Sequence, residues 1–300
     1  MLYFDHVVTA HEDGVMLETL LRPLHMGRTL RRILQQQQSV LVNGQPYFWR
    51  KRVYVGDHIT VTAPQDDREV VIPEPIDIAI VYEDDHVLVV DKPAHVLIHP
   101  VGRRRTGTLL AGVVHYLKLQ QKSGRVFLLH RLDQDTSGLV LLAKHKLAQE
   151  RLARTFLAHD IHRGYTAFVQ GIMKMEERSI IAPIIAVPQT PTRHAVASYG
   201  HHAVTHVNVM VRYLLSGASK VSLRLDTGRT HQIRVHLSYI GYPILGDALY
   251  GPGTPDLVAD RLDRQALHAS SLSFVHPMTK ALITVQSPLP CDLRKLETFL

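Results

Sequence analysis

The sequence predicts an α+β protein whose larger part contains a mixed, largely antiparallel sheet. From residue 76 onward, short apolar runs recur at close intervals, joined partly by turn residues and partly by segments with helical spacing. The composition is that of a globular protein, with 45% hydrophobic and 20% charged residues. A length of 300 residues is sufficient for two domains.

The N-terminal part predicts two helices followed by a small sheet. Leucines fall at helical spacing in 15–24, and a second helix is predicted over 29–38. A strand over 40–42 leads into Asn43-Gly44, the strongest short signal for a hairpin turn, and another strand follows over 59–63. We therefore predict a small α/β domain.

Charged residues are segregated in this part of the chain. Between Thr19 and Gly56 there is no aspartate or glutamate, whereas seven lysines and arginines fall there. Such sorting predicts one basic face that contacts the phosphates of RNA, and the alternative is a solvated helix face. The candidates for RNA contact in this segment are Arg28, Arg31, Arg32, Lys51 and Arg52.

The same segment resembles the S-four-type RNA-binding domain, named after a small-subunit ribosomal protein. The matching positions are Leu17, Leu21, Gly27-Arg28, Leu30, Ile33, Val42-Asn43-Gly44 and Val55-Gly56-Asp57. Residues 64–75 carry three prolines and four acids, a composition typical of an extended linker. We therefore expect an RNA-binding domain at 1–63, a linker at 64–75 and a second domain at 76–300.

The second domain is predicted to mix strands with helices. Helices are predicted over 108–119, 147–159 and 231–240, and a short one at the C-terminus. Thr230 is placed to cap the third of these helices and Gly241 to end it. Strands are predicted over 87–90, 126–129, 139–143, 165–169, 204–214, 221–225, 271–275 and 282–285. Residues 173–202 are expected to form a loop or a hairpin excursion.

A polar turn, His130 to Gly138, lies between two apolar runs that are expected to be buried strands. It contains an arginine, two aspartates, two hydroxyls and a glycine. Polar residues on a loop held by two buried strands are where chemistry is usually placed. The alternative is a surface turn in which Asp133 and Asp135 hydrogen-bond the local backbone.

Missing motifs exclude several kinds of functional site. The chain has no Gly-rich phosphate loop, no dinucleotide fingerprint and no Gly-x-Ser-x-Gly elbow. His202 and His206 are four residues apart, a spacing that suits metal ligands on a helix, but their segment alternates like a strand. A single cysteine, Cys291, excludes an internal disulfide and a multi-thiolate metal site. We expect no metal and no organic cofactor.

Charge and hydropathy indicate the partner and the compartment. The net charge of +7 and the pI near 9.5 favour an anionic partner. No apolar run approaches the length of a membrane span, and the N-terminus lacks the pattern of a signal peptide. We therefore expect a cytoplasmic protein without membrane contact.

The polar turn and several other segments resemble RluA-type pseudouridine synthases. The signature is His130-Arg131-Leu132-Asp133 with Thr136-Ser137-Gly138. Further matches follow in one consistent order from residue 76 to 287, and they are Asp91-Lys92-Pro93, His99-Pro100, Tyr165 to Gly171, Gly228 to His236, Gly246-Asp247, Tyr250-Gly251 and Arg264 to Ala269. The resemblance implies an enzyme that isomerises uridine within RNA. In this reaction the bond from sugar to nitrogen breaks, the base rotates, and a carbon–carbon bond forms.

The resemblance also implies roles for four residues. Asp133 aligns with the nucleophilic aspartate, Arg131 with a residue beside it, Tyr165 with the active-site tyrosine, and Arg234 with the basic partner of the aspartate. The residue types suit this chemistry, because a nucleophilic carboxylate must stay ionised in a partly dry pocket and a nearby arginine favours the charged form. Tyr165 offers a face for the displaced base, and Arg131 could fill the vacated space or hold the RNA backbone. The alternative for Tyr165 is a purely structural role on its strand, and the alternative for Arg234 is an exposed position on its helix without a catalytic partner.

Further basic residues are expected to contact RNA. The loop with Arg103, Arg104 and Arg105 is more neutral in the family, so these arginines are either phosphate contacts or part of a solvated loop. Arg229 lies in the segment before the third helix. Ribosomal RNA is the favoured substrate, transfer RNA is the other option, and a monomer is the simpler expectation. The alternative function is a non-catalytic RNA-binding or ribosome-associated protein that retains an unused active site.

Overall fold

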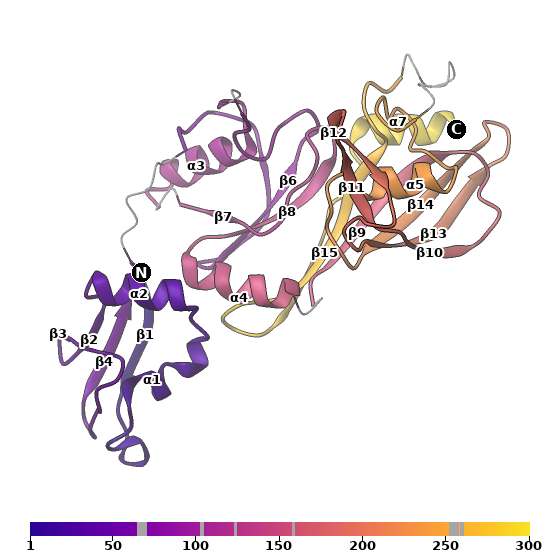
Figure 1. The fold of residues 1–300 in the computed structure, drawn as a ribbon. Helices are drawn as coiled ribbons and strands as arrows, with labels where there is room; N and C mark the ends of the chain where they lie inside the picture. Colours follow the sequence, from indigo (N-terminus) through magenta and orange to yellow (C-terminus); the bar gives the residue numbers. More distant parts are fainter. Residues whose placement is uncertain (65–70, 103–104, 123–124, 158–159, 252–257, 259–260) are drawn as a thin grey trace.

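Two sheets organise the protein, which is represented by a computed structural model (Figure 1). The structure describes residues 1–64, 71–102, 105–122, 125–157, 160–251, 258 and 261–300. A four-stranded sheet with the order β1-β4-β2-β3 lies in the N-terminal part, and a larger sheet, ten-stranded within the described residues, lies in the rest. Its strand pairs are antiparallel except for the short parallel pairing of β15 with β8. The predicted α+β class with a mixed, largely antiparallel sheet is confirmed.

The small sheet packs with two short helices. Its elements are β1 (Leu2–Val7), α1 (Leu17–Leu20), α2 (Arg28–Gln36), β2 (Val40–Val42), β3 (Gln45–Pro46) and β4 (His58–Thr62). Strand β1 is absent from the sequence prediction because only Tyr3 among its six residues is buried, which leaves no apolar alternation to detect. The hairpin at Asn43-Gly44 is confirmed, with both residues at positive φ.

The helix predicted over 15–24 is wrong in its extent. Helix α1 ends at Leu20, and a 3-10 turn follows over Arg22–Leu24. Pro23 has no backbone N–H to continue the α-helical ladder, and His25 adopts a left-handed conformation with φ 52 that ends the segment. The helix predicted over 29–38 is observed as α2.

The large sheet is built from strands far apart in the sequence. They are β5 (Ala79–Glu83), β6 (Val87–Lys92), β7 (Phe127–Leu128), β8 (Ser137–Ala143), β9 (His162–Gln170), β10 (Glu177–Ile181), β13 (Val204–Tyr213), β14 (Ala218–Leu225), β15 (Leu267–Val275) and β16 (Leu282–Gln286). The excursion predicted over 173–202 contains β10 and a separate hairpin of β11 (Ile184–Val187) and β12 (Thr190–Val196).

Helices cover both faces of this sheet. Helices α3 (Leu109–Leu119), α5 (Gln232–Tyr239) and α7 (Cys291–Phe299) share one apolar core, to which β8 contributes Val140 and Leu142. Helix α4 (Lys146–Leu157) packs on the opposite face, where β8 contributes Leu139 and Leu141. Strand β8 is therefore buried on both faces, as the sequence predicts. No helix in the described part of the chain is long and apolar enough to cross a membrane.

The structure corrects two details beside the polar turn. The run predicted as a buried strand over 126–129 forms only the two-residue strand β7 and is half-buried, because Leu128 and Leu129 line a pocket. Thr230 does not cap α5, since His231 occupies that position with φ 55 and makes no capping hydrogen bond. Gly241, with φ 84, follows the end of α5 as predicted.

Candidate active site

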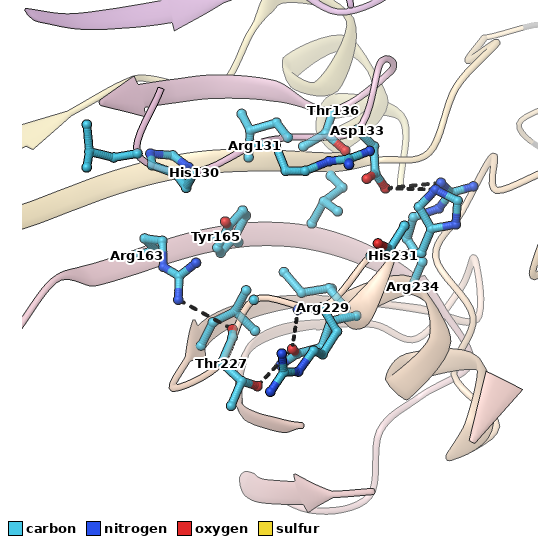
Figure 2. Close-up of a pocket in the computed structure, with 18 of the residues that line it drawn as sticks. His130, Arg131, Asp133, Thr136, Arg163, Tyr165, Thr227, Arg229, His231 and Arg234 are labelled. Carbon is cyan, nitrogen blue, oxygen red and sulfur yellow. Dashed lines mark hydrogen bonds and ion pairs between the residues drawn. The ribbon is translucent and has the colours of Figure 1, made fainter. Parts of the chain in front are cut away.

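A pocket of about 600 Å³ lies where the polar turn, the start of β9 and the segment before α5 meet (Figure 2). Its lining includes Arg131, Asp133, Tyr165, Arg229 and Arg234. The structure thus brings together five sequence-predicted residues from three separate parts of the chain. A cavity of this size is in the range of small-molecule sites.

Lys92 links the polar turn to strand β6. It lies at the end of β6 and is fully buried, and its Nζ donates hydrogen bonds to the carbonyl oxygens of Pro93, Val96 and Gln134 at 2.8, 2.9 and 2.7 Å. Burial lowers the pKa of Lys92 to about 7. The three acceptors match the three N–H groups of the charged ammonium, so the protonated form is the one that ties the turn to β6.

Two residues before β15 hold the turn from the other side. The Nη1 of Arg264 donates to the carbonyl of Asp135 at 3.0 Å, and the Nε2 of Gln265 donates to the Thr136 hydroxyl at 3.1 Å. Within the turn, the Thr136 N–H donates to the carbonyl of Asp133 at 3.1 Å. The backbone that presents Asp133 is therefore fixed by buried and partly buried hydrogen bonds on both sides.

Asp133 forms an ion pair with Arg234, which is itself held by Asp247. The Nη1 of Arg234 donates to Oδ2 of Asp133 at 3.1 Å, across 101 residues of sequence. The Nε and Nη2 of Arg234 donate to the two carboxylate oxygens of Asp247 at 2.8 and 2.9 Å, a bidentate arrangement. Asp247 is fixed in turn, because its Oδ1 accepts the N–H groups of Leu249 and Tyr250.

Asp133 is more exposed than the arginine and the aspartate that hold it in place. The side chains of Asp247 and Arg234 are 0% and 9% exposed, whereas that of Asp133 is 19% exposed at the pocket. Burial alone would lower the pKa of Arg234, but the hydrogen bonds and charges of Asp247 and Asp133 outweigh it and raise this pKa. Arg234 is thus a permanent cation beside a carboxylate that can still reach a ligand.

The imidazole ring of His231 also lies close to Asp133. Its Nε2 lies 3.9 Å from Oδ2 of Asp133, and its Nδ1 is 2.8 Å from the hydroxyl of Tyr250, which also accepts the backbone N–H of His194. Burial lowers the pKa of His231 and raises that of Tyr250, so the ring is neutral and the hydroxyl keeps its proton. In the tautomer whose Nδ1 accepts from the Tyr250 hydroxyl, the ring proton lies on Nε2 and faces Asp133.

Tyr165 lies on β9, where it is paired with Leu223 of β14 and is buried in the pocket wall. Burial raises its pKa, so its hydroxyl stays protonated. Arg163, two residues earlier, is also buried, and its guanidinium lies 5.0 Å from the ring centre of Phe156. Tyr165 and Arg163 thus form adjacent parts of one wall (Figure 2).

Of the remaining basic candidates of this domain, two line the pocket, one is exposed elsewhere, and two lie outside the described part of the chain. Arg131 and Arg229 are exposed and line the pocket, and the Nε of Arg229 donates to the carbonyl of His202 at 2.9 Å. Arg105 is exposed, whereas Arg103 and Arg104 lie outside the described residues. Among the described residues, no group of three or more histidine, cysteine, aspartate or glutamate side chains could hold a metal ion.

Comparison with protein families decides the relationship of this chain. A family model described as RNA pseudouridylate synthase matches residues 86–239, which run from the start of β6 to the end of α5 and include the polar turn. The chain belongs to the RNA pseudouridine synthase family. The resemblance to RluA-type pseudouridine synthases is confirmed, and with it the enzyme class, an isomerase that acts on uridine in RNA.

Several RNA pseudouridine synthases resemble the chain over most of its length. An uncharacterised RNA pseudouridine synthase of Bacillus subtilis is 36% identical over 97% of this chain and 95% of the relative. Ribosomal large subunit pseudouridine synthase D of Pasteurella multocida is 38% identical over 87% of this chain and 83% of the relative. The solved structure of human RNA pseudouridylate synthase domain containing 1 is 27% identical, with a TM-score of 0.58, over 75% of this chain and 86% of that protein.

The basic candidates of the N-terminal part of this pseudouridine synthase occupy two neighbouring elements. Arg28, Arg31 and Arg32 lie on α2, where Arg28 and Arg32 are exposed. The guanidinium of Arg31 lies 5.6 Å from the ring centre of Trp49, in the loop that leads to β4. The exposed arginines on α2 are accessible to a phosphate backbone.

Lys51 and Arg52 lie in the same loop before β4, and both are exposed. The Nζ of Lys51 is 5.3 Å from the ring centre of Tyr47 and 5.5 Å from that of Phe48, which is itself exposed. Arg52 donates a hydrogen bond to the carbonyl of Gly14. The loop therefore combines cations with aromatic faces, a combination that suits unpaired bases.

Sequence reasoning missed the residues that support the site. Asp247 and Lys92 both lie in segments that matched the family, yet nothing in their local pattern indicates a buried ion pair or a tie to the polar turn. The one local sign for Lys92 is its position just after the apolar run Val87 to Val90. A lysine close to a buried strand is rarely buried itself unless it has a specific partner.

Proposed function

We propose that this protein converts specific uridines in structured RNA to pseudouridine, with Asp133 as the nucleophile. The observation that carries the proposal is the ion pair of Asp133 with Arg234 at the pocket, in which Arg234 is oriented by the buried Asp247. The permanent cation orients the carboxylate of Asp133 at the pocket, and the partial exposure of that carboxylate leaves an oxygen available to the substrate.

The reaction that we assign to this pocket is an isomerisation without net redox change. A carboxylate oxygen of Asp133 forms a bond to the sugar C1′ as the bond between C1′ and N1 breaks, and N1 of the released base takes the electron pair; the bond from Asp133 to C1′ breaks later, when C5 attacks C1′. The base rotates so that C5 faces C1′, the new carbon–carbon bond forms, and the proton on C5 leaves while N1 gains one. The carboxylate of Asp133 is regenerated when the product forms.

The surrounding residues fit the needs of a displaced base. Tyr165 forms an apolar wall for the ring, and stacking on an aromatic side chain is worth about 1–3 kcal/mol per base. That gain offsets the cost of about a few kcal/mol for taking a base out of its stack. Arg131 is exposed at the rim, where it can fill the vacated place in the stack or hold the backbone beside it.

We propose ribosomal RNA as the substrate. Relatives from Pasteurella multocida and Nitrosomonas europaea, 38% and 39% identical to this chain, are named ribosomal large subunit pseudouridine synthase D. The exposed cations Arg28, Arg32 and Lys51 supply an additional surface for phosphates, which suits a long folded RNA. We assign residues 1–63 to RNA binding and residues 76–300 to catalysis, with 64–75 as the linker.

Release of tritium from RNA labelled at C5 of uridine tests the proposal. The wild-type protein should release tritium from ribosomal RNA of cells that lack the gene, and transfer RNA from the same cells serves as the second substrate. The Asp133→Ala protein should bind RNA and release none. Binding without tritium release by the wild-type protein would instead indicate the non-catalytic RNA-binding function.

A further inference from the structure

Helix α4 carries a set of contacts that the proposed reaction does not use. Its first turns pack into the N-terminal unit, which we define as residues 1–64. Leu147 of α4 is fully buried in an apolar cluster whose other buried members, from Tyr3 to Val61, all belong to that unit. His145, just before α4, lies with its ring centre 5.1 Å from that of Tyr3. A residue of the catalytic domain thus completes the core of the N-terminal unit.

Glu150 makes the first polar link between the two parts. Its Oε2 accepts the backbone N–H of Gly27 at 2.7 Å, although the two residues are 123 positions apart. Gly27 directly precedes α2, so the carboxylate also lies at the positive end of that helix. A Cβ at position 27 would lie 3.2 Å from the same carboxylate oxygen, so a larger residue there would require Glu150 to shift by a few tenths of an ångström.

Arg151 makes the second polar link and is 9% exposed. Its Nε donates to the carbonyl of Leu24 at 3.0 Å and its Nη2 to that of Pro23 at 3.3 Å, both in the N-terminal unit. Its Nη1 donates to the carbonyl of Pro277 at 3.1 Å, in the connection between β15 and β16. One guanidinium therefore joins the N-terminal unit to the large sheet.

The other end of α4 reaches the pocket. Phe156 lines it and lies under the guanidinium of Arg163. Glu150 and Phe156 are six residues apart, which is about 9 Å along a helix axis. Domains joined by a flexible linker usually move relative to one another unless a specific interface holds them. Here one helix contacts the N-terminal unit at one end and contributes Phe156 to the pocket lining at the other.

We propose that α4 fixes the N-terminal unit beside the pocket, so that the RNA segment bound by this unit determines which uridine enters. Glu150 and Arg151 are then positioning residues for substrate selection, and they take no part in the chemistry. This inference rests on the proposed function, because it requires that the protein act on a long RNA that reaches both parts. A fixed separation selects one uridine among many that the pocket alone would accept.

The test compares docking variants on a long and a short substrate. The variants are Glu150→Ala with Arg151→Ala, the conservative Glu150→Gln, and Arg154→Ala, which removes one positive charge from an exposed position of α4 and keeps every contact described above. Each protein is assayed on ribosomal RNA of cells that lack the gene and on a short stem-loop around the mapped uridine. The radius of gyration from small-angle X-ray scattering reports whether the N-terminal unit has separated. Exchange of the Gly27 amide would not, because this amide loses its acceptor in Glu150→Ala whether or not the unit moves.

The double variant should have a larger radius of gyration than the wild type, because both polar links between α4 and the N-terminal unit are removed. Its KM for ribosomal RNA should rise several-fold, or new uridines should be modified, while kcat on the stem-loop stays within twofold of wild type. Glu150→Gln keeps an acceptor oxygen and should restore part of the difference, and Arg154→Ala should match the wild type.

Two results would overturn the inference. One is unchanged KM and unchanged choice of uridine in a double variant whose larger radius of gyration shows that the N-terminal unit has separated. The other is an equal loss of kcat on both substrates, which would assign the contacts to the integrity of the pocket. A wild-type protein that modifies neither substrate would instead contradict the proposed function.

Discussion

Replacing Asp247 by Asn perturbs the orientation of Arg234 without changing the shape of the site. The carboxylate Oδ1 accepts one N–H of Arg234 and the N–H groups of Leu249 and Tyr250, and Oδ2 accepts the Nε–H of Arg234. An asparagine that keeps Oδ1 in place must turn its NH₂ group toward that Nε–H. A donor then faces a donor, and the arginine must move or lose that bond.

The magnitude follows from the burial of the pair. Breaking a buried ion pair costs about 3–5 kcal/mol, and the 0% exposed carboxylate of Asp247 belongs to that class. Asp133 remains beside Arg234 and compensates part of the charge, so the free energy of unfolding should fall by about 3 kcal/mol. A displacement of about 1 Å in a catalytic group costs on the order of 100-fold in rate, and we expect a loss of this size in kcat.

Urea unfolding and tritium release measure the two effects on the same protein. The matched control is Asp5→Asn, since Asp5 forms an exposed pair with His58 at 2.8 Å. This control should lose less than about 1 kcal/mol and keep its kcat. A stability loss in Asp247→Asn together with a kcat within twofold of wild type would refute the idea that a fixed Arg234 is needed for turnover.

Three further predictions concern the turn and the RNA surface. The charged Lys92 donates to the carbonyl of Gln134 in the polar turn and to two carbonyls just after β6, and its pKa is about 7. Therefore kcat of the wild type should fall as the pH rises above 7, and Lys92→Met should be slow and lack this fall. Gly138 has φ 112, and a Cβ there would lie 2.3 Å from the carbonyl oxygen of Ala269, so Gly138→Ala should destabilise the protein by about 2 kcal/mol or more, as seen in thermal unfolding. Replacing Arg28 and Arg32 together by Ala should reduce the salt dependence of RNA binding, by about 0.7–0.9 in the log–log slope for each phosphate that the variant no longer neutralises.

Each of these predictions has an outcome that contradicts it. Below pH 7, Lys92 is protonated in both the folded and the unfolded chain, and between pH 7 and 10.5 only the unfolded chain holds its proton. The free energy of unfolding should therefore rise in this window by up to about 1.4 kcal/mol per pH unit relative to Lys92→Met, opposite to kcat. A fall in kcat that persists in Lys92→Met would assign it to another group.

The other two predictions are checked in the same manner. A Gly138→Ala protein as stable as wild type would show that the backbone between β8 and β15 can move aside. For the arginine pair, Arg178→Ala on the exposed strand β10 is the charge control. This control removes one positive charge where the arginine pair removes two. A change of slope half as large in the control would therefore mean that the overall positive charge, and no local phosphate binding, sets the salt dependence.

Local sequence signals predicted the parts of the fold that depend on local chemistry. The turn at Asn43-Gly44, the end of α5 before Gly241 and the burial of β8 all follow from a few neighbouring residues. Strand β1 could not be predicted, because its stability comes from pairing with β4, more than fifty residues later, and not from an apolar pattern of its own.

The same limit applies to the residues of the site. The pairing of Asp133 with Arg234 was expected only through the resemblance to the family, since no spacing rule brings together residues 101 positions apart. Asp247 and Lys92 had no assigned role because their function is to hold other residues, and that role becomes visible only when their partners are placed in space. The docking of Leu147 into the N-terminal core is a contact of the same kind.

The central claim is that Asp133 performs the isomerisation, and pseudouridine mapping in cells tests it most directly. Total RNA is mapped from cells that lack the gene and carry either the wild-type protein or Asp133→Asn, a substitution that removes the charge and keeps the shape. We predict that one or more ribosomal uridines become pseudouridine with the wild type and remain uridine with Asp133→Asn at equal protein levels. Restoration of the same pseudouridines by Asp133→Asn would contradict the account.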